Sequence, residues 1–231
     1  MDDRTFARLT AAHAPAHIAE TLRPYITQPR QEKIEALLDG RLPTIRVAME
    51  SPSDPHNAAA VVRTAEAFGV LGVHVIATEG RALHAKSTTQ GSYRWVRTHH
   101  HGTLDAFLGH ASMNGVAIYG AWMDAEHTLG ELPVNRPMCL LFGNENRGLS
   151  EQARKACTAG FRIPMVGMSE SLNLSVSAAV SMYDVTSRHR AAGAVGLDEG
   201  ARAELQARHY LDSVDDRLWA GLLGVERTEP S

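Results

Sequence analysis

One loop of the sequence can surround a flat ligand with its own backbone. Residues Ile163 to Asn173 read I-P-M-V-G-M-S-E-S-L-N. An apolar strand end leads into a proline-broken loop with one glycine, and Ser-Leu-Asn then opens a helix rich in small residues. Such a loop can bring several backbone amides and carbonyls around a heteroaromatic ring. The sequence therefore predicts a small-molecule pocket for a ligand that is not primarily a phosphate.

Two further loops carry polar side chains directly after apolar runs. The first holds Asn57 and, six residues later on a predicted helix, Arg63; the second reads F-G-N-E-N-R-G-L-S over residues 142–150. Ligands of open α/β sheets bind beyond the carboxyl ends of the strands, so we expect the three loops to meet there. Because the loops lack the G-x-x-x-x-G-K and G-x-G-x-x-G patterns, a P-loop enzyme and a Rossmann-type cofactor site are disfavoured.

The composition is that of a folded protein without a global charge bias. The chain has 231 residues, of which 44% are apolar and 21% charged, enough for a full core. A net charge of -3 does not indicate nucleic-acid binding, so any basic surface must be local. The two cysteines, Cys139 and Cys157, form no metal or disulfide framework. With no secretory signal and no apolar run of membrane-spanning length, we expect a cytoplasmic protein that does not contact membranes.

Strands and helices alternate around these loops, which predicts an α/β domain with a mainly parallel sheet over residues 45–192. Asn57 is expected to cap the helix that ends at Gly69, and residues 80–101 are expected to be irregular. Residues 3–41 should form two or three short helices broken by prolines, and residues 197–223 should be helical. We expect strands at 45–49, 72–77, 116–121, 138–142 and 161–163, with the other helices at 104–113, 150–157 and 172–192.

Together the three loops resemble the motifs of the SPOUT methyltransferases, specifically the TrmH family of RNA ribose 2′-O-methyltransferases. The matches are N-x-x-x-x-x-R-T from Asn57, L-F-G-N-E-N-R-G-L-S from Leu141, and I-P-M-x-G-M-x-x-S-L-N-x-S-V from Ile163. All three occur in order, and the resemblance covers about residues 30–192. Two flanking segments, Q-E-K-I-E-A-L-L-D-G-R-L-P and G-S-Y-R-W-V, are most similar to members that methylate a D-loop guanosine ribose in tRNA, position 18 in tRNA numbering.

The resemblance implies an α/β fold with helices on both faces of the sheet and a deep C-terminal trefoil knot. Periodicity could not have shown the knot, because knotted folds are rare exceptions. The resemblance also implies a homodimer with S-adenosylmethionine bound in the knot at the interface, and no metal. The expected domains are an RNA-binding helical extension over 1–42, the methyltransferase domain over 43–193, and a second helical extension over 194–231.

Carried onto this sequence, the resemblance implies two sets of site residues. The cofactor should be held mainly by backbone at Gly120, Ala121, Leu141, Gly143, Ile163, Met165 and Leu172. The catalytic set is Arg63, Asn57, Glu145, Ser171 and Asn173.

Arg63 is the residue that we expect to contribute most to catalysis. The family assigns the matching arginine a base-like role, but arginine does not deprotonate easily. The physically safer role is to clamp a substrate phosphate and stabilise charge that develops on the 2′-oxygen. Outside the motif, the same side chains would be a solvated helix arginine, helix caps and an ordinary loop carboxylate.

RNA binding requires a local basic surface. Residues 81–101 contain four basic side chains and no acid, interleaved with Tyr93 and Trp95, which suits phosphate contact and base stacking. The alternative is a loop with solvated charges. Three consecutive histidines, 99–101, cannot all face one metal from a strand. The RNA candidates are Lys86, Arg94, Trp95, Arg97, Arg188 and Arg190.

The leading expectation is a tRNA guanosine ribose 2′-O-methyltransferase. One alternative is the same reaction on ribosomal RNA, although about 40 broken-helical residues are too few for a separate compact RNA-binding domain. The other is a non-catalytic RNA-binding protein on a retained fold, which would be expected to lose Arg63 or the Ser171–Asn173 pair.

Overall fold

A computed structural model describes residues 3–77 and 95–225 of the chain. The chain divides into two compact units, one of residues 42–195 and one that joins residues 1–41 to residues 196–231. The larger unit contains all three motif loops. In the smaller unit, the two chain ends that the sequence suggests as separate extensions pack against each other.

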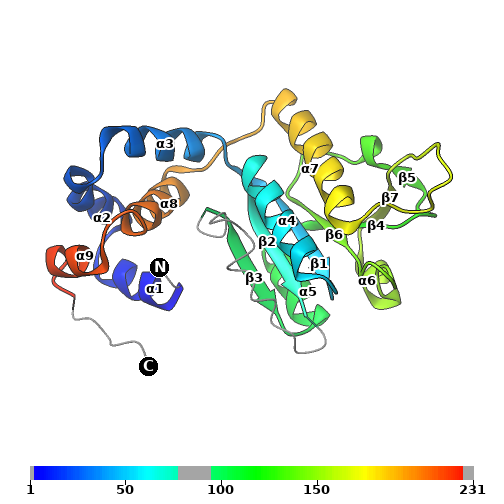
Figure 1. Cartoon of the computed structure of the whole chain (residues 1–231), viewed down its shortest axis with the longest axis horizontal. Helices are drawn as coiled ribbons and strands as arrows, with labels where there is room; N and C mark the ends of the chain where they lie inside the picture. The colour runs from blue at the N-terminus through cyan, green and yellow to red at the C-terminus, as the bar shows by residue number, and fades with distance from the viewer. Residues whose placement is uncertain (1–2, 78–94, 226–231) are drawn as a thin grey trace. The chain divides into compact units, whose positions relative to one another are not determined.

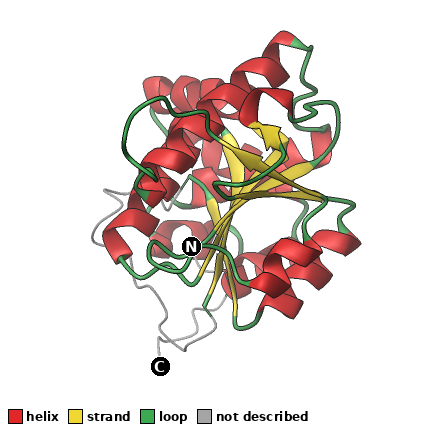
Figure 2. Ribbon diagram, turned by 90° about the vertical axis from the view of Figure 1, so that its right-hand side faces the viewer, coloured by secondary structure: helices red, strands yellow, loops and turns green. Residues whose placement is uncertain are grey.

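A seven-stranded sheet forms the centre of the larger unit, and all of its paired strands run parallel. The order across the sheet is β3-β2-β1-β6-β4-β7-β5. Figure 2 shows the strands in yellow with helices around them. This confirms the predicted α/β class. The strands are β1 (Leu42–Glu50), β2 (Val70–Ile76), β3 (Arg97–His101), β4 (Ala117–Ala121), β5 (His127–Thr128), β6 (Met138–Phe142) and β7 (Ala159–Arg162).

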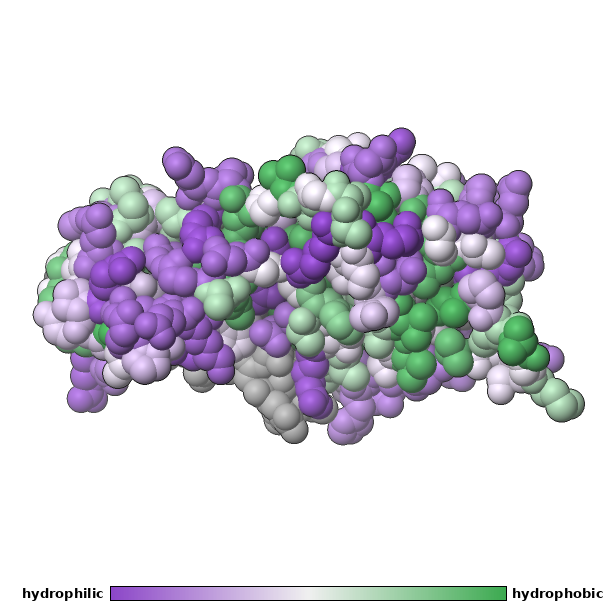
Figure 3. All heavy atoms as spheres, turned by 90° about the horizontal axis from the view of Figure 1, so that it is seen from above, coloured by the Kyte–Doolittle hydropathy of each residue, from purple (hydrophilic) through white to green (hydrophobic). Residues whose placement is uncertain are grey.

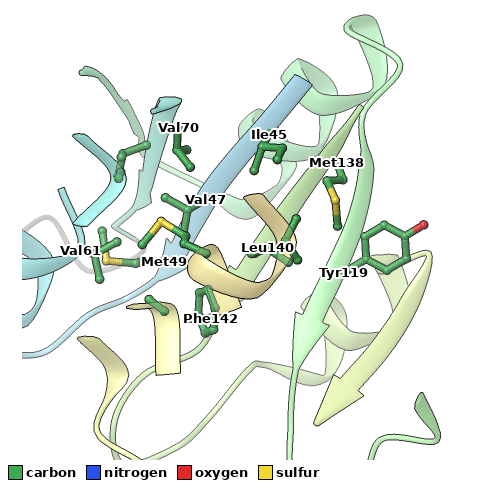
Figure 4. Packing of buried hydrophobic residues seen from close by; sticks show 14 of the residues in the cluster. Ile45, Val47, Met49, Val61, Val70, Tyr119, Met138, Leu140 and Phe142 are labelled. Atoms are coloured by element: carbon green, nitrogen blue, oxygen red, sulfur yellow. The ribbon is translucent and has the colours of Figure 1, made fainter. Parts of the chain in front are cut away.

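Helices cover both faces of this sheet (Figure 1). Side chains alternate between the faces of a strand, so each strand supplies two separate cores. On one face, Val47 and Leu140 pack with α4 (Pro55–Ala67) and α7 (Leu174–Ala191) in the cluster that Figure 4 shows. On the other face, buried residues of the same strands pack with α5 (Leu104–Met113) and α6 (Glu151–Ala156).

The smaller unit is helical. Its elements are α1 (Asp3–Ala12), α2 (Pro15–Leu22), the 3-10 turn η1 (Arg23–Tyr25), α3 (Gln28–Asp39), α8 (Glu199–Leu211) and α9 (Asp216–Leu222). Helix α8 packs on α2 and α3, and Arg202 of α8 forms ion pairs with Glu35 and Asp39 of α3. The prolines of residues 3–41 separate short helices, as the sequence predicts, and they lie at the helix starts, where the missing N–H costs nothing.

The structure corrects two local predictions and adds a strand. Asn57 does not cap α4, because the side chain of Asp54 accepts from the His56 amide and Pro55 already lies in the first turn. Residues 97–101, predicted to be irregular, form β3, a strand at the edge of the sheet. Strand β5 was not predicted, because two residues carry no periodic signal. It leads into the 3-10 turn η3 (Leu129–Glu131).

Candidate active site

A set of hydrogen bonds ties the loop after β1 to the loop after β6. The two strands are parallel neighbours, so their carboxyl ends lie at the same edge of the sheet. The carboxylate of Glu145 accepts from the Ser53 amide at 2.9 Å, from Ser53 Oγ at 2.6 Å and from Asn57 Nδ2 at 3.0 Å. Burial alone raises the pKa of Glu145, but the bonds from Ser53 and Asn57 outweigh it and lower the pKa to about 2. Glu145 is therefore ionised throughout the neutral range.

A second set of bonds holds the same two loops a few residues away. Glu50, a buried carboxylate at the end of β1, accepts from the Ser150 amide at 2.8 Å and from Ser150 Oγ at 2.7 Å. Asn144 Nδ2 donates to the Ser51 carbonyl at 2.7 Å. Ser51 has a positive φ of 48°, a conformation that serine adopts at a cost. These contacts hold the two loops in one arrangement, with Ser51 strained within it.

A cavity of about 430 Å³ lies beyond the carboxyl ends of β4, β6 and β7, a size typical of small-molecule sites. Five of the seven predicted cofactor residues line it: Ala121, Gly143, Ile163, Met165 and Leu172. Gly120 and Leu141 do not, because they lie one layer behind in β4 and β6. The loops from two of the three motifs therefore converge on one cavity.

The backbone of the third motif loop is free to bind a ligand. Residues 164–172 belong to no helix or strand. None of their backbone groups is hydrogen-bonded to a described residue. Asn173 caps α7, since its Oδ1 accepts from the Ser175 amide at 2.8 Å and from Ser175 Oγ at 2.7 Å. Ser171 is exposed and lines the cavity, whereas Asn173 does not. Asn173 thus forms the helix cap that was the alternative to a catalytic role, its side-chain amide nitrogen points to no described partner, and the catalytic role stays a prediction.

Arg63 is exposed on α4. It does not line the cavity of its own chain, and neither does Asn57. The described part of one chain therefore brings Glu145 and Ser171 to the cavity but leaves Arg63 apart from it.

The predicted RNA-contact residues lie in different parts of the chain. Lys86 and Arg94 lie outside the described residues. Trp95 and Arg97 are half-buried near the start of β3, and Arg190 is exposed and donates to the Phe68 carbonyl at 3.0 Å. All of these contacts stay predictions.

Arg188 has a clear role inside the fold. It pairs with Asp184 at 2.7 Å and donates to the carbonyls of Leu129 and Leu132. These bonds hold α7 against η3, and a contact of Arg188 with RNA stays a prediction.

Several residues of this region are not among the predicted site residues. Ser53 and Glu50 hold the loops, and Trp122, Arg154 and Arg162 line the cavity. A glutamate at a strand end and an arginine in a short helix carry no signal by themselves, since their partners are distant in sequence. Among the described residues, no group of histidine, cysteine and carboxylate side chains could hold a metal ion.

Comparison with known proteins identifies the larger unit. Residues 44–183, more than half of the chain, match the SpoU rRNA Methylase family. The chain belongs to the SpoU methylase family. The matched region of this SpoU methylase contains all three motif loops, so the resemblance inferred from the motifs is confirmed.

Relatives of this SpoU methylase include proteins that are named as tRNA-modifying enzymes. The tRNA (guanosine(18)-2′-O)-methyltransferase of Thermus thermophilus is 33% identical over 168 residues, which are 72% of this chain and 87% of that protein. The crystal structure of the A. aeolicus TrmH/SpoU tRNA modifying enzyme has a TM-score of 0.72 and 28% identity, covering 81% of this chain and 98% of that one.

A more distant neighbour shares the fold. It is the SpoU methyltransferase AviRb from Streptomyces viridochromogenes in complex with the cofactor AdoMet, with a TM-score of 0.60 and 23% identity, covering 68% of this chain and 62% of that one.

Among the helices that the structure describes in this SpoU methylase, none has both the length and the apolar character needed to span a membrane.

Proposed function

We propose that this SpoU methylase transfers a methyl group from S-adenosylmethionine to the ribose 2′-oxygen of a guanosine in the D-loop of tRNA, at position 18. The observation that carries the proposal is the cavity beyond β4, β6 and β7, which is lined by the loop after β6 and the loop after β7. The loop that carries Asn57 is joined to it by the hydrogen bond from Asn57 to Glu145. The relatives with 33% identity are named for this reaction. A cytoplasmic location goes with the proposal, since tRNA is found there.

The residues around the cavity fit S-adenosylmethionine. A volume of about 430 Å³ suits a ligand of this size, and the backbone of residues 164–172, which has no hydrogen bond to a described residue, can bind the edge of an adenine. When bound, the cofactor supplies an electrophilic methyl group, so the protein has mainly to orient the 2′-hydroxyl and stabilise charge. The proposed holding residues are Ala121, Gly143, Ile163, Met165 and Leu172, with Gly120 and Leu141 supporting them from behind.

Arg63 and its neighbours would act on the RNA. We assign Arg63 to bind a phosphate next to the target ribose and to stabilise negative charge on the 2′-oxygen as its proton leaves. Ser171, exposed at the cavity, would hydrogen-bond the ribose or its phosphate. Glu145 and Asn57 would keep the loops in place, since their polar atoms bind each other. Asn173 would add a contact through its amide nitrogen.

We also propose that two copies form a homodimer that completes this site. Helix α7 exposes Val176, Val180 and Tyr183, three apolar side chains spaced along one stripe, with exposed fractions of 46%, 40% and 62%. Figure 3 views the side on which α7 lies and shows apolar residues exposed there. The ring of Tyr183 contacts Phe68, just past the helix that carries Arg63. A second copy on this stripe could bring its own Arg63 toward the cavity that one chain leaves incomplete.

The trefoil knot implied by the family is a further part of the proposal. Strand β7 lies between β4 and β5, which the chain joins directly through residues 122–126. The later segment therefore has to pass across the earlier connection to reach its place. This strand order supports a knot through residues 117–191.

The reaction is tested with the full chain, labelled S-adenosylmethionine and an unmodified tRNA transcript. The matched control is the same tRNA with 2′-deoxyguanosine at position 18, which lacks the accepting oxygen. We expect label on the first RNA and none on the second. Label on ribosomal RNA fragments but not on tRNA would replace the proposed substrate by that of the alternative. Label at another nucleotide of tRNA would correct the position.

A further inference from the structure

Two glycines create a flat seat on the sheet beside the cavity. Gly120 of β4 and Gly160 of β7 are direct partners across the two parallel strands. A Cβ added to Gly160 would lie 1.9 Å from Cζ2 of Trp122, and one added to Gly120 would lie 2.7 Å from its Cζ3. No side chain fits at either position. The indole of Trp122 therefore rests directly on the backbone of two neighbouring strands.

Other contacts fix the same indole. The Trp122 amide donates to the Phe161 carbonyl at 3.0 Å, which continues the strand pairing past the end of β4. The guanidinium of Arg154 lies 5.3 Å from the centre of the ring, within the range of a cation–π contact. Arg154 is itself held by Asp124 at 3.6 Å. The ring is thus held in place before any ligand arrives.

The indole also faces the cavity. Trp122 is half-buried and lines it, next to Ala121 at the end of β4. The two other aromatic residues among the lining side chains, Phe142 and Phe161, are almost fully buried. Trp122 therefore supplies the accessible aromatic surface among the described residues of the cavity wall.

We propose that Trp122 is a specificity-determining residue of the cofactor pocket, whose indole packs against the adenine of S-adenosylmethionine. The inference rests on the proposed function, because it takes the cavity to be the cofactor site. An aromatic surface favours a flat heteroaromatic ring over an aliphatic group of equal size. The Gly120–Gly160 pair sets how far the ring projects into the cavity.

Binding of S-adenosylhomocysteine to the full chain, measured by calorimetry, tests the proposal. We expect Trp122→Ala to weaken binding by about five- to hundredfold, through loss of an aromatic contact and of the apolar area that it buries, and Trp122→Phe to retain most of the affinity. Equal affinities of wild type and Trp122→Ala would overturn the inference while leaving the proposed function intact. A wild-type protein that binds neither S-adenosylmethionine nor its product would contradict both.

A double-mutant cycle separates a contact from a general disturbance of the fold. In Gly160→Ala the new methyl group must push the indole toward the cavity, so this variant should also bind weakly. Once the indole is removed, the same change has nothing to displace. We therefore expect Gly160→Ala/Trp122→Ala to bind no more weakly than Trp122→Ala. Additive losses of affinity would contradict the proposed packing of the indole on the two glycines. Thermal melts of all variants identify any that fail to fold.

Tryptophan emission gives a readout that does not depend on turnover. Saturation with S-adenosylhomocysteine should change the emission of wild type and of Trp219→Phe, a control in the helical unit, but not of Trp122→Phe. An emission change on tRNA addition alone, without response to the cofactor product, would assign the indole to RNA instead and overturn the inference.

Discussion

The side-chain amide of Asn57 donates to Oε1 of Glu145 at 3.0 Å, across 88 residues of sequence. The bond joins the first turn of α4 to the loop after β6, and Ser53 binds the other carboxylate oxygen. Both residues belong to motif segments that sequence similarity marks as functional. Their contact shows that part of the motif serves to hold two loops together, so that the position of α4 relative to the cavity is fixed.

The ionised state of Glu145 predicts a pH-dependent contribution to stability. Its pKa is about 2 in the folded protein, below the usual value of about 4.5. A carboxylate with a depressed pKa stabilises the fold above pH ~4.5, and this stabilisation is lost as the pH falls toward 2. We expect Glu145→Gln to lower the free energy of unfolding by about 1 kcal/mol at pH 6, after allowance for solvent screening.

Urea unfolding at several pH values checks this expectation. The difference between wild type and Glu145→Gln should shrink steadily between pH 4.5 and pH 2. Glu126→Gln, an exposed carboxylate elsewhere in the larger unit, serves as the control and should show no comparable trend. A difference that stays constant over this pH range would mean that the negative charge of Glu145 does not stabilise the loops.

Arg63 should matter for transfer and not for cofactor binding. Because the guanidinium is exposed and lies apart from the cavity, Arg63→Ala should leave the affinity for S-adenosylhomocysteine within about twofold. Loss of one group that stabilises developing charge should lower kcat by about 100- to 1,000-fold. Single-turnover methylation of tRNA measures the rate directly.

A matched control for Arg63→Ala is Arg136→Ala, an exposed arginine just before β6, at the opposite edge of the sheet. It should methylate at the wild-type rate. Arg63→Lys should recover part of the rate, since it keeps the charge but not the bidentate geometry. Undiminished turnover in Arg63→Ala would remove Arg63 from the mechanism.

The strands and loops that could be predicted are those with a local signal. Apolar runs such as Met138–Phe142 were recognised because a buried parallel strand is apolar on both faces. Strand β3 was missed because its sequence, R-T-H-H-H, is polar and because β2 is its only partner among the described strands. The capping of α4 was misassigned because Asp54, directly before Pro55, competes with Asn57 for the role.

The site could be predicted only as far as the motifs reach. They located the cavity loops, but the bonds of Glu145 and the seat of Trp122 join segments far apart in the chain. Whether Gly120 and Gly160 become neighbours depends on the order of strands in the sheet, which no local pattern specifies. Arg188 shows the opposite case, since its pairing with Asp184 four residues earlier is readable from the sequence.

The apolar stripe of α7 predicts a dimer that a single charge should break. Val180→Asp places a carboxylate in the middle of the stripe, where burial against a second copy would be costly. We expect the variant to be monomeric in sedimentation at micromolar concentration and to lose methyl transfer, while its fold is unchanged. Met113→Asp, an exposed apolar residue at the end of α5, is the control and should stay dimeric. A monomeric wild type that methylates tRNA would contradict the proposed assembly.

A cluster of stacked imidazoles should make the larger unit sensitive to mild acid. His74 of β2 is buried, its Nδ1 lies 3.0 Å from Nε2 of His101, and burial, reinforced by neighbouring positive groups, lowers its pKa to about 2. The groups that face it are His99, His101, His110 and Arg46. Its neutral form therefore stabilises the fold above pH ~6.5, and this contribution falls as the pH drops below that value, by up to about 1.4 kcal/mol per pH unit.

His74→Leu should remove this dependence, because leucine fills the site and binds no proton. Between pH 6.5 and 4.5 the free energy of unfolding of wild type should fall more steeply with decreasing pH than that of the variant. The difference between the two slopes should correspond to the uptake of about one proton on unfolding. His56→Gln, an exposed histidine in the first turn of α4, should keep the wild-type slope. Parallel curves for wild type and His74→Leu would mean that another group takes up the proton, and His101, whose pKa is also lowered by burial, would be the next to replace.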